Sequence, residues 1–197
     1  MIRLAIPADG ARLAEIYAPA VVDSGISFEV EPPDAAEMAR RVGYVTERNP
    51  WLVCEHRGVV AGYAYASRHR DRAAYDWSVE VSAYVGAEHH RVGIARALYT
   101  SLFAALAVQG FYNAYAGVAL PNDASIAFHA AMGFTPVGTY RQVGYKAGRW
   151  RDVSWFERTI APHAADPRPP RLLADVRDDP AFVAAVSAGA PLLRTPS

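Results

Sequence analysis

One short segment combines the residue types that an anion-binding loop requires. His90-Arg91-Val92-Gly93-Ile94-Ala95 lies between an apolar stretch ending at Val85 and a long helix expected to begin near Val92. The small residues Gly93 and Ala95 let a ligand approach the backbone. The first N–H groups of a helix lack intrahelical partners and lie at the positive end of its dipole. The segment predicts either a pyrophosphate site or only a tight strand-to-helix turn.

A second candidate is a carboxylate within an apolar stretch. Glu80 stands in the middle of Trp77 to Val85, which we expect to be a central strand covered on both faces. An unpaired buried carboxylate is costly. Glu80 is therefore either paired with a structural arginine or hydroxyl, or it is a general base that faces a substrate amine.

Two further candidates have ordinary structural interpretations beside the functional ones. His129 projects from the helix expected over Ala124 to Met132, where a lone histidine is usually a surface or core residue. The segment Arg68-His69-Arg70-Asp71-Arg72 is a charged loop between two strands, which by itself is typical of a solvated turn.

Other chemistries lack support in the sequence. It contains no G-x-S-x-G and no G-x-x-x-x-G-K-[ST] motif. The six histidines form no i, i+4 pair and no cysteine cluster accompanies them, so we expect no metal site. Cys54 lies in an apolar run, which favours a buried structural thiol over a nucleophile.

The elements that must position these residues alternate along the chain. Asp9 and Asp34 are expected to cap two helices, and Gly110 and Gly133 to end two more. His56-Arg57-Gly58 is typical of a hairpin turn. The order β, α, α, β, β, β, α, β, α, β, β predicts an α+β fold around one mixed sheet. The expected strands are Ile2–Ile6, Pro50–Glu55, Val59–Ser67, Trp77–Val85, Tyr112–Val118 and further strands within Phe134–Ile160. Two of the expected helices begin at Asp9 and Asp34, and the other two cover Val92–Gln109 and Ala124–Met132.

Composition and charge bound the function. The 197 residues are 52% hydrophobic and 20% charged, which is typical of a globular protein. The formal net charge of zero argues against an extended nucleic-acid interface. A single cysteine excludes an internal disulfide and favours a reducing, cytoplasmic setting. No apolar run approaches the ~20 residues of a membrane span, and Asp9 interrupts the region where a signal peptide would be apolar.

The composition changes after about residue 160. All 11 tyrosines and all four tryptophans precede this point, and Ala161–Arg171 forms a Pro-rich linker. Phe182 is the one aromatic residue that follows. We therefore expect a working domain over 1–160 and a tail over 161–197 that is partly disordered or docked and adds little to the core. Truncation after Ile160 is expected to leave the fold nearly intact.

The loop at 90–95 resembles the Q/R-x-x-G-x-G/A signature of the GCN5-related N-acetyltransferases (GNAT), whose loop holds the pyrophosphate of acetyl-CoA. His90 departs from the Gln or Arg of that signature, and Ala95 is an accepted variant of its last glycine. Over about residues 2–160, other segments resemble the phosphinothricin/methionine sulfoximine N-acetyltransferase subfamily. They are Pro50-Trp51-Leu52-Val53, Val59-Val60-Ala61-Gly62, Ala74-Tyr75-Asp76-Trp77-Ser78-Val79-Glu80, Leu120-Pro121-Asn122-Asp123-Ala124-Ser125 and Gly148-Arg149-Trp150.

The resemblance implies a GNAT-like fold and an activity. The expected fold is a mixed, mostly antiparallel sheet flanked by helices and splayed between the fourth and fifth strands. The expected reaction is direct transfer of acetyl from acetyl-CoA to the α-amine of a small amino acid, in a homodimer without a metal. Two alternatives stay open: transfer to a different amine, such as another amino acid, a polyamine or a protein N-terminus, and a non-catalytic acetyl-CoA-binding module.

The resemblance also implies roles for individual residues. Glu80 is the expected base, and His129 a second base or a substrate ligand. The expected acetyl-CoA contacts are Ala83, Tyr84, Val85, Arg91, Val92, Gly93, Ile94, Ala95, Arg96 and Asn122. The expected acceptor contacts are Phe28, Arg70, Asp71, Arg72 and Tyr75.

Overall fold

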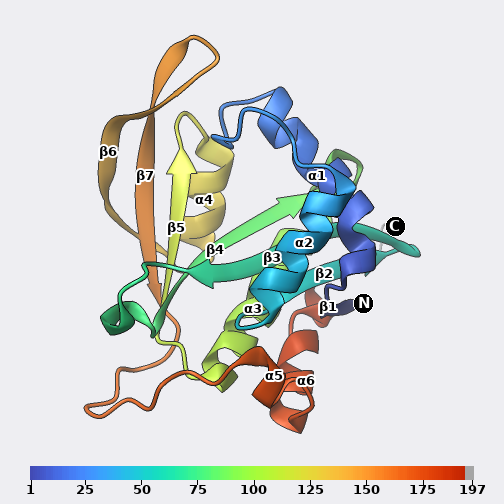
Figure 1. Cartoon of the computed structure of the whole chain (residues 1–197), viewed down its shortest axis with the longest axis vertical. Helices are drawn as coiled ribbons and strands as arrows, with labels where there is room; N and C mark the ends of the chain where they lie inside the picture. Colours follow the sequence, from blue (N-terminus) through green and yellow to red (C-terminus); the bar gives the residue numbers. More distant parts are fainter. Residues whose placement is uncertain (194–197) are drawn as a thin grey trace.

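The computed structural model describes residues 1–193, which contain one seven-stranded sheet in the order β1-β2-β3-β4-β5-β7-β6 (Figure 1). Neighbouring strands are antiparallel except for the parallel pair β4 and β5. The strands are β1 (Ile2–Leu4), β2 (Trp51–His56), β3 (Val59–Arg68), β4 (Ser78–Val85), β5 (Asn113–Ala119), β6 (Thr135–Lys146) and β7 (Arg149–Thr159).

The sheet opens between β4 and β5. These strands pair only over Ser78–Glu80 and Asn113–Tyr115, so the rest of β4 as far as Val85 has no partner on that edge. Figure 1 shows β1 to β4 lying across the direction of β5, β7 and β6. The predicted α+β fold and the splay between the fourth and fifth strands are confirmed.

Six α-helices within the described residues surround the sheet. They are α1 (Gly10–Val22), α2 (Ala35–Thr46), α3 (Ile94–Gln109), α4 (Asp123–Ala131), α5 (Leu173–Val176) and α6 (Pro180–Ser187). Asp34 caps α2 by accepting a hydrogen bond from the Glu37 N–H. The side chain of Asp9 does not cap α1, contrary to the prediction, because it pairs with Arg3 and accepts the Ile6 N–H.

The starting point of α3 also differs from the prediction. The helix begins at Ile94 and not at Val92, because Gly93 adopts a left-handed conformation with φ of 87°. At the other end, Gly110 closes the helix as expected, with φ of 99°. The loop over residues 90–92 and the first turn of α3 are therefore separated by a glycine at a position where a side chain would be strained.

The core lies on both faces of the sheet. Because side chains of a strand alternate between faces, Trp51 and Val53 pack with α1 and α2, and Leu52 and Cys54 pack on the α3 side. Cys54 is 0% exposed, and burial raises the pKa of its thiol, which confirms a buried structural cysteine. Among the described helices, none is long and apolar enough to span a membrane.

The chain beyond residue 160 corrects a prediction. After an extended segment, α5 and α6 pack against α3, and Leu173, Val176 and Phe182 join the main core cluster at 3%, 0% and 0% exposure. Figure 1 shows this segment returning along the sheet to lie beside α3. The expectation that it adds little to the core is wrong. Residues 194–197 of the predicted tail lie outside the described part of the chain.

Candidate active site

Glu80 lies where β4 and β5 separate. It is the last residue of β4 that pairs with β5, opposite Tyr115. Its neighbours Val79 and Val81 belong to the core on the α3 side, so the Glu80 side chain lies on the face of α1 and α2. That side chain is 31% exposed, which corrects the expectation that the strand is fully covered at this point.

The carboxylate of Glu80 has two partners on the loop after β3. Arg70 Nη1 lies 2.9 Å and His69 Nδ1 3.1 Å from Glu80 Oε1. The sequence left two interpretations of Glu80, a structural partner of an arginine or hydroxyl and a general base. The pairing with an arginine is observed. The same oxygen receives both contacts, and Oε2 accepts no side-chain hydrogen bond from the described residues. One carboxylate oxygen remains open to a ligand or water.

His69 was not singled out from the sequence as a functional residue. Its ring stacks on Tyr115 with centroids 4.3 Å apart, and its side chain is 12% exposed. Burial and the Arg70 charge lower the pKa of His69 against the opposing effect of Glu80. The neutral ring donates its Nδ1–H to Glu80. In the sequence, His69 is only a histidine inside a run of charged residues. Its contact with Glu80 of β4 becomes visible in the fold.

His129 is buried between α3 and α4 at 7% exposure. Its Nδ1–H donates to the Ser125 backbone oxygen at 2.8 Å, and Nε2 accepts from the Tyr99 hydroxyl at 3.2 Å. Burial lowers the pKa of the ring, which keeps it neutral. Tyr99 belongs to the apolar stripe of α3, so no sequence signal marked it as a polar partner.

The opening of the sheet contains a cavity of about 420 Å³ between α1, β4 and α4. Ala83–Val85 line one side of it, and Asn122 and His129 line the other. Asn122 also caps α4, because its side chain accepts the Ser125 N–H at 3.1 Å. The cavity brings together residues that the sequence assigned to the acyl arm of the cofactor and to catalysis.

A second cavity, of about 740 Å³, lies at the start of α3. Arg91 and the range 93–96 line it, and Val85, His90, Ala95 and Phe128 line both cavities. The two cavities therefore adjoin along these residues, and we refer to them together as the channel. His90 Nε2 lies 3.1 Å from the Val85 oxygen and ties the loop to the end of β4. Val92 lines neither cavity and packs toward the core.

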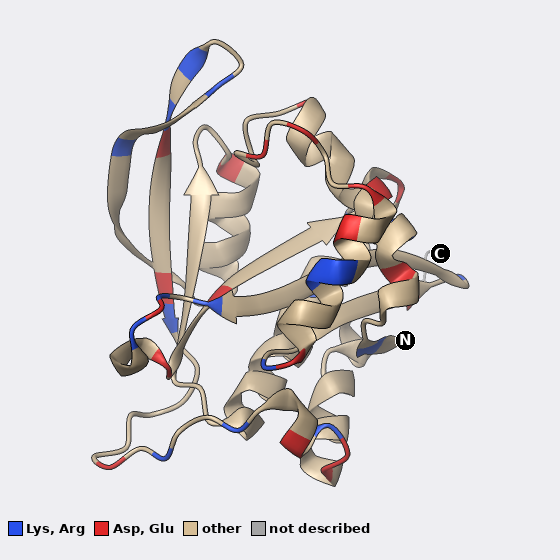
Figure 2. Cartoon of the chain, viewed as in Figure 1, with Lys and Arg blue, Asp and Glu red and all other residues tan. Residues whose placement is uncertain are grey.

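The expected acceptor residues are only partly brought together. Arg70 contacts Glu80, and Tyr75 lies against His69 with centroids 5.9 Å apart. Asp71 and Arg72 are exposed on the same loop and line neither of the two cavities of the channel. Figure 2 shows basic and acidic segments side by side in this loop after β3.

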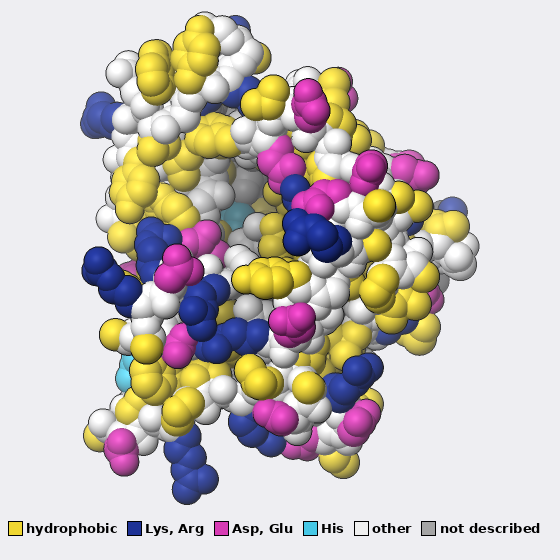
Figure 3. Space-filling view, in the orientation of Figure 1, with side chains coloured by type: hydrophobic (Ala, Val, Ile, Leu, Met, Phe, Trp, Pro, Cys, Tyr) yellow, Lys and Arg dark blue, Asp and Glu magenta, His cyan; other side chains and the backbone are white. Residues whose placement is uncertain are grey.

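A smaller cavity of about 340 Å³ adjoins this loop. His69 and Arg70 line it with Tyr115, Tyr140 and Trp155 of the neighbouring strands. In Figure 3 the molecule is hollowed between the β6–β7 hairpin and the helices α1 and α2. The aromatic walls and the guanidinium of Arg70 suit a small molecule that carries an anionic group.

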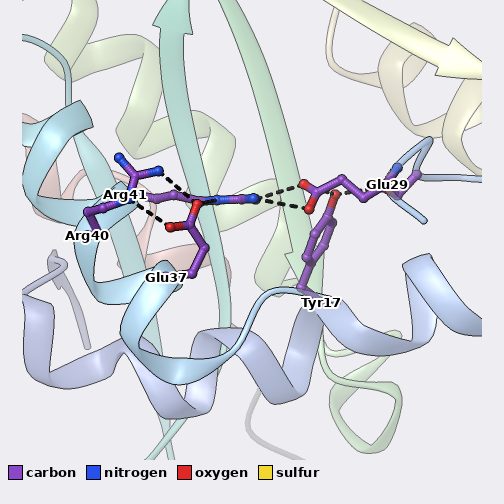
Figure 4. A network of polar contacts seen from close by, with 6 residues as sticks. Tyr17, Glu29, Glu37, Arg40 and Arg41 are labelled. Carbon is purple, nitrogen blue, oxygen red and sulfur yellow. Dashed lines mark hydrogen bonds and ion pairs between the residues drawn. The ribbon is translucent and has the colours of Figure 1, made fainter. Parts of the chain in front are cut away.

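Phe28 lies in the loop between α1 and α2. Tyr17 Oη lies 2.6 Å from Ser27 Oγ, and Arg41 Nη1 donates to Glu29 at 2.7 Å. Figure 4 shows Glu29 held between Arg41 of α2 and Tyr17 of α1. These contacts fix both neighbours of Phe28, whose ring lies against Gly144 of β6.

Comparison with known proteins agrees with this geometry. Residues 2–155 match the family described as the acetyltransferase (GNAT) domain. The chain belongs to the GNAT acetyltransferase family. Among the described residues of this GNAT enzyme, no three His, Cys, Asp or Glu side chains cluster as metal ligands would.

Several relatives of this GNAT enzyme have named activities. It is 42% identical to the phosphinothricin N-acetyltransferase of Streptomyces viridochromogenes, over 86% of this chain and 92% of that protein. It is 34% identical to the L-methionine sulfoximine/L-methionine sulfone acetyltransferase of Salmonella typhimurium, over 83% and 96%. The crystal structure of a phosphinothricin acetyltransferase from Sinorhizobium meliloti in complex with AcCoA superposes with a TM-score of 0.79 at 34% identity, covering 88% and 97%.

Proposed function

We propose that the chain is an N-acetyltransferase that moves the acetyl group of acetyl-CoA to the α-amine of a small amino acid such as phosphinothricin or methionine sulfoximine. The observation that carries the proposal is the channel from the α3 loop to the opening beside β4. The names of the relatives at 42% and 34% identity support both the donor chemistry and the acceptor class.

The channel offers separate subsites to the cofactor. The N–H groups at the start of α3 suit the pyrophosphate, and His90 holds this loop against β4. The free edge of β4 at Ala83–Val85 offers backbone groups to the pantetheine arm. Its N–H groups also stabilise the oxyanion that forms when the thioester carbonyl is attacked.

Glu80 acts as the base in this proposal. The acceptor amine is mostly protonated near neutral pH, so it must lose a proton before it attacks the thioester carbon. Glu80 Oε2 accepts that proton directly or through water, and the neutral amine nitrogen forms the new C–N bond. The C–S bond then breaks, and the CoA thiolate leaves and takes up a proton. His69 and Arg70 position the carboxylate by binding its other oxygen.

His129 has a different role in the proposal. Both of its ring nitrogens have partners, and its ring is neutral. We assign it to the wall of the cavity, where it orients the hydroxyl of Tyr99. On the acceptor side, Phe28 and Tyr75 supply apolar contact, and Arg70 and Arg72 supply positive charge for the anionic end of the amino acid. Asp71 contributes to the same loop through its backbone oxygen, which accepts a hydrogen bond from Arg68 at 3.3 Å.

The proposal includes a homodimer in a reducing compartment. The β6–β7 hairpin carries exposed large apolar side chains, which a second copy would cover. They are Val137, Tyr140, Val143, Tyr145 and Trp150, each at least 51% exposed. The free thiol of Cys54 is compatible with a reducing setting. Analytical ultracentrifugation at micromolar concentration is expected to give a dimer mass.

An acceptor screen tests the proposed function. Purified enzyme is incubated with acetyl-CoA and a panel of amines, and the released CoA thiol is measured. We expect phosphinothricin and methionine sulfoximine to give the highest kcat/KM. Turnover restricted to polyamines or protein N-termini would contradict the assigned acceptor, and binding of acetyl-CoA without turnover of any amine would contradict catalysis.

A further inference from the structure

Gly117 is an exposed glycine in the middle of the sheet. It lies on β5, which has β4 on one side and β7 on the other. Its neighbours Ala116 and Val118 are buried in the core on the α3 side, whereas Gly117 itself is exposed on the opposite face. A glycine inside a strand often marks a place where a ligand or another backbone comes close. We call the space over its missing side chain the Gly117 gap.

The fold itself does not require a glycine at this position. The φ angle of Gly117 is not positive, so its backbone conformation is open to any residue. A Cβ on Gly117 would lie 3.4 Å from the ring of Trp155 and 3.5 Å from Val153 Cγ1, and both are ordinary van der Waals contacts. The Gly117 gap is therefore free space that a side chain could fill without disturbing its neighbours.

The gap lies close to the proposed base. Tyr115 pairs with Glu80 at the point where β4 and β5 separate, and it lines the cavity of about 340 Å³ together with Trp155. Gly117 follows Tyr115 by two residues, so both face the same side of the sheet and lie about 6.6 Å apart along the strand. This spacing is comparable with the length of an extended methionine-like side chain. An amino acid whose amine lies at Glu80 can therefore reach the gap with the end of its side chain.

The atoms that border the gap are apolar. They are the ring carbons Cη2 and Cζ2 of Trp155 and the methyl carbon Cγ1 of Val153. The positive charge of this region belongs to Arg70, which lines the adjoining cavity and donates to Glu80. The polar atoms of a sulfoximine or phosphinate group therefore suit Arg70, and the alkyl group on the same sulfur or phosphorus suits the gap.

We propose that Gly117 forms the floor of a subsite for the terminal alkyl group of the acceptor, and that this subsite extends the acceptor class beyond S-methyl compounds. The inference rests on the proposed function, in which Glu80 takes the proton of the acceptor amine. Because no side chain closes the gap, α-amino acids with S-ethyl and S-butyl sulfoximine groups are acceptors as well as methionine sulfoximine. Their larger alkyl groups contact Trp155 and Val153, and the chemistry at the amine is unchanged.

Acceptors that differ only in the S-alkyl group test this subsite. Values of kcat/KM are measured through CoA release for methionine, ethionine and buthionine sulfoximine. We expect the wild type to turn over all three within about tenfold of one another. Gly117→Val fills the gap, so it is expected to lower kcat/KM for buthionine sulfoximine at least about tenfold relative to methionine sulfoximine, as a misfitted alkyl group implies. Gly117→Ala, whose Cβ fits the fold, is expected to give a smaller change in the same direction.

A variant that enlarges the subsite distinguishes it from a defect of the fold. Val153→Ala removes the methyl groups that border the gap, so it is expected to raise kcat/KM for buthionine sulfoximine relative to methionine sulfoximine. A general defect would lower both values and would not move their ratio in opposite directions in the two variants. Gly43→Val adds the same atoms on α2, where nothing lies within 4 Å of the new Cβ, and is expected to leave the ratio unchanged.

The outcomes separate this inference from the proposed function. A wild type that turns over methionine sulfoximine and rejects buthionine sulfoximine overturns the inference alone. An unchanged ratio between these acceptors in Gly117→Val does the same. Absence of turnover with all three sulfoximines and with phosphinothricin overturns the assigned acceptor class and the inference with it.

Discussion

Glu80 shows how one side chain can combine the two roles that its sequence position suggested. One oxygen is bound by Arg70 and His69, and the other is free of side-chain donors among the described residues. The ion pair lies at the point where β4 and β5 separate. Structural pairing and base catalysis are thus compatible at this position.

Replacing Glu80 tests its role as base. Glu80→Gln keeps the shape and removes the basic oxygen, so kcat is expected to fall by about 10²–10⁴, the usual contribution of a general base. Part of the loss should return at high pH, where the acceptor amine deprotonates without help. Steady-state kinetics across pH provide the measurement, with Glu47→Gln at the exposed position directly after α2 as control. A variant that keeps more than roughly a third of kcat would assign the base elsewhere.

The buried histidine of α4 makes stability depend on pH. Burial lowers the pKa of His129 below its ordinary value of 6.5, so the unfolded chain binds a proton there that the folded chain does not. The neutral His129 ring therefore contributes fully to the free energy of unfolding above pH 6.5, and this contribution is lost as the pH falls below it. The free energy of unfolding is measured by urea titration at about pH 7.5 and at about pH 5. Its decrease between these two pH values is expected to be smaller in His129→Asn than in the wild type. An equal drop in both proteins would contradict a neutral buried ring.

Residue types alone identified some of these positions and missed others. Glu80 was visible because a carboxylate is unusual in an apolar strand, and the α3 loop because glycine and alanine precede a long helix. His69 and Tyr99 were missed. Their partners lie 11 and 30 residues away along the chain and on other elements, so no local pattern connects them.

At the scale of elements, the β6–β7 hairpin reaches over the loop between α1 and α2. Lys146 Nζ donates to the backbone oxygens of Val21 and Ser27 at 2.6 and 2.7 Å. Phe28 rests directly on Gly144, where a Cβ would collide with its ring. The hairpin therefore determines where this wall of the proposed acceptor site lies.

A methyl group on β6 tests that arrangement. Gly144→Ala forces the Phe28 ring to move, and overpacking of this kind costs about 1–3 kcal/mol. We expect the KM of the acceptor to rise about fivefold or more, with the KM of acetyl-CoA unchanged. Gly43→Ala is the matched control, because nothing lies within 4 Å of its added Cβ and Gly43 is on α2, away from the hairpin. Equal changes in both Michaelis constants would indicate a general defect of the fold.

Element order was predictable because apolar periodicity and capping residues are local signals. The strand boundaries and the helix α2 followed from them. The opening between β4 and β5 had no such signal and came from the family resemblance. The unexpected start of α3 depends on one left-handed glycine, whose conformation is set by the turn and not by composition.

At the scale of the whole molecule, the segment after residue 160 is part of the fold. It holds seven of the 14 prolines and one aromatic residue, Phe182, so the sequence indicated a tail. Leu173, Val176 and Phe182 nevertheless join the main core cluster, and such long-range contacts leave no periodic pattern. Truncation after Ile160 is now expected to expose that surface and to destabilise the domain.

Phe182 provides the quantitative test. It is 0% exposed in the main core cluster, and Phe182→Ala is expected to lower the free energy of unfolding by about 3–5 kcal/mol. The adjacent Val183 is 56% exposed, so Val183→Ala should change it by no more than about 0.5 kcal/mol. Urea unfolding measures both. Similar small effects in the two variants would restore the interpretation of a loosely attached tail.

The burial of Cys54 has a practical consequence for every assay described above. It is the one thiol of the chain, it is fully enclosed, and burial keeps its thiolate form scarce. Aromatic disulfide reagents react with thiolates. The folded enzyme therefore does not react with such a reagent. Each equivalent of chromophore that forms corresponds to one molecule of released CoA. Slow appearance of a single extra equivalent in the absence of acetyl-CoA would in turn count molecules that have unfolded.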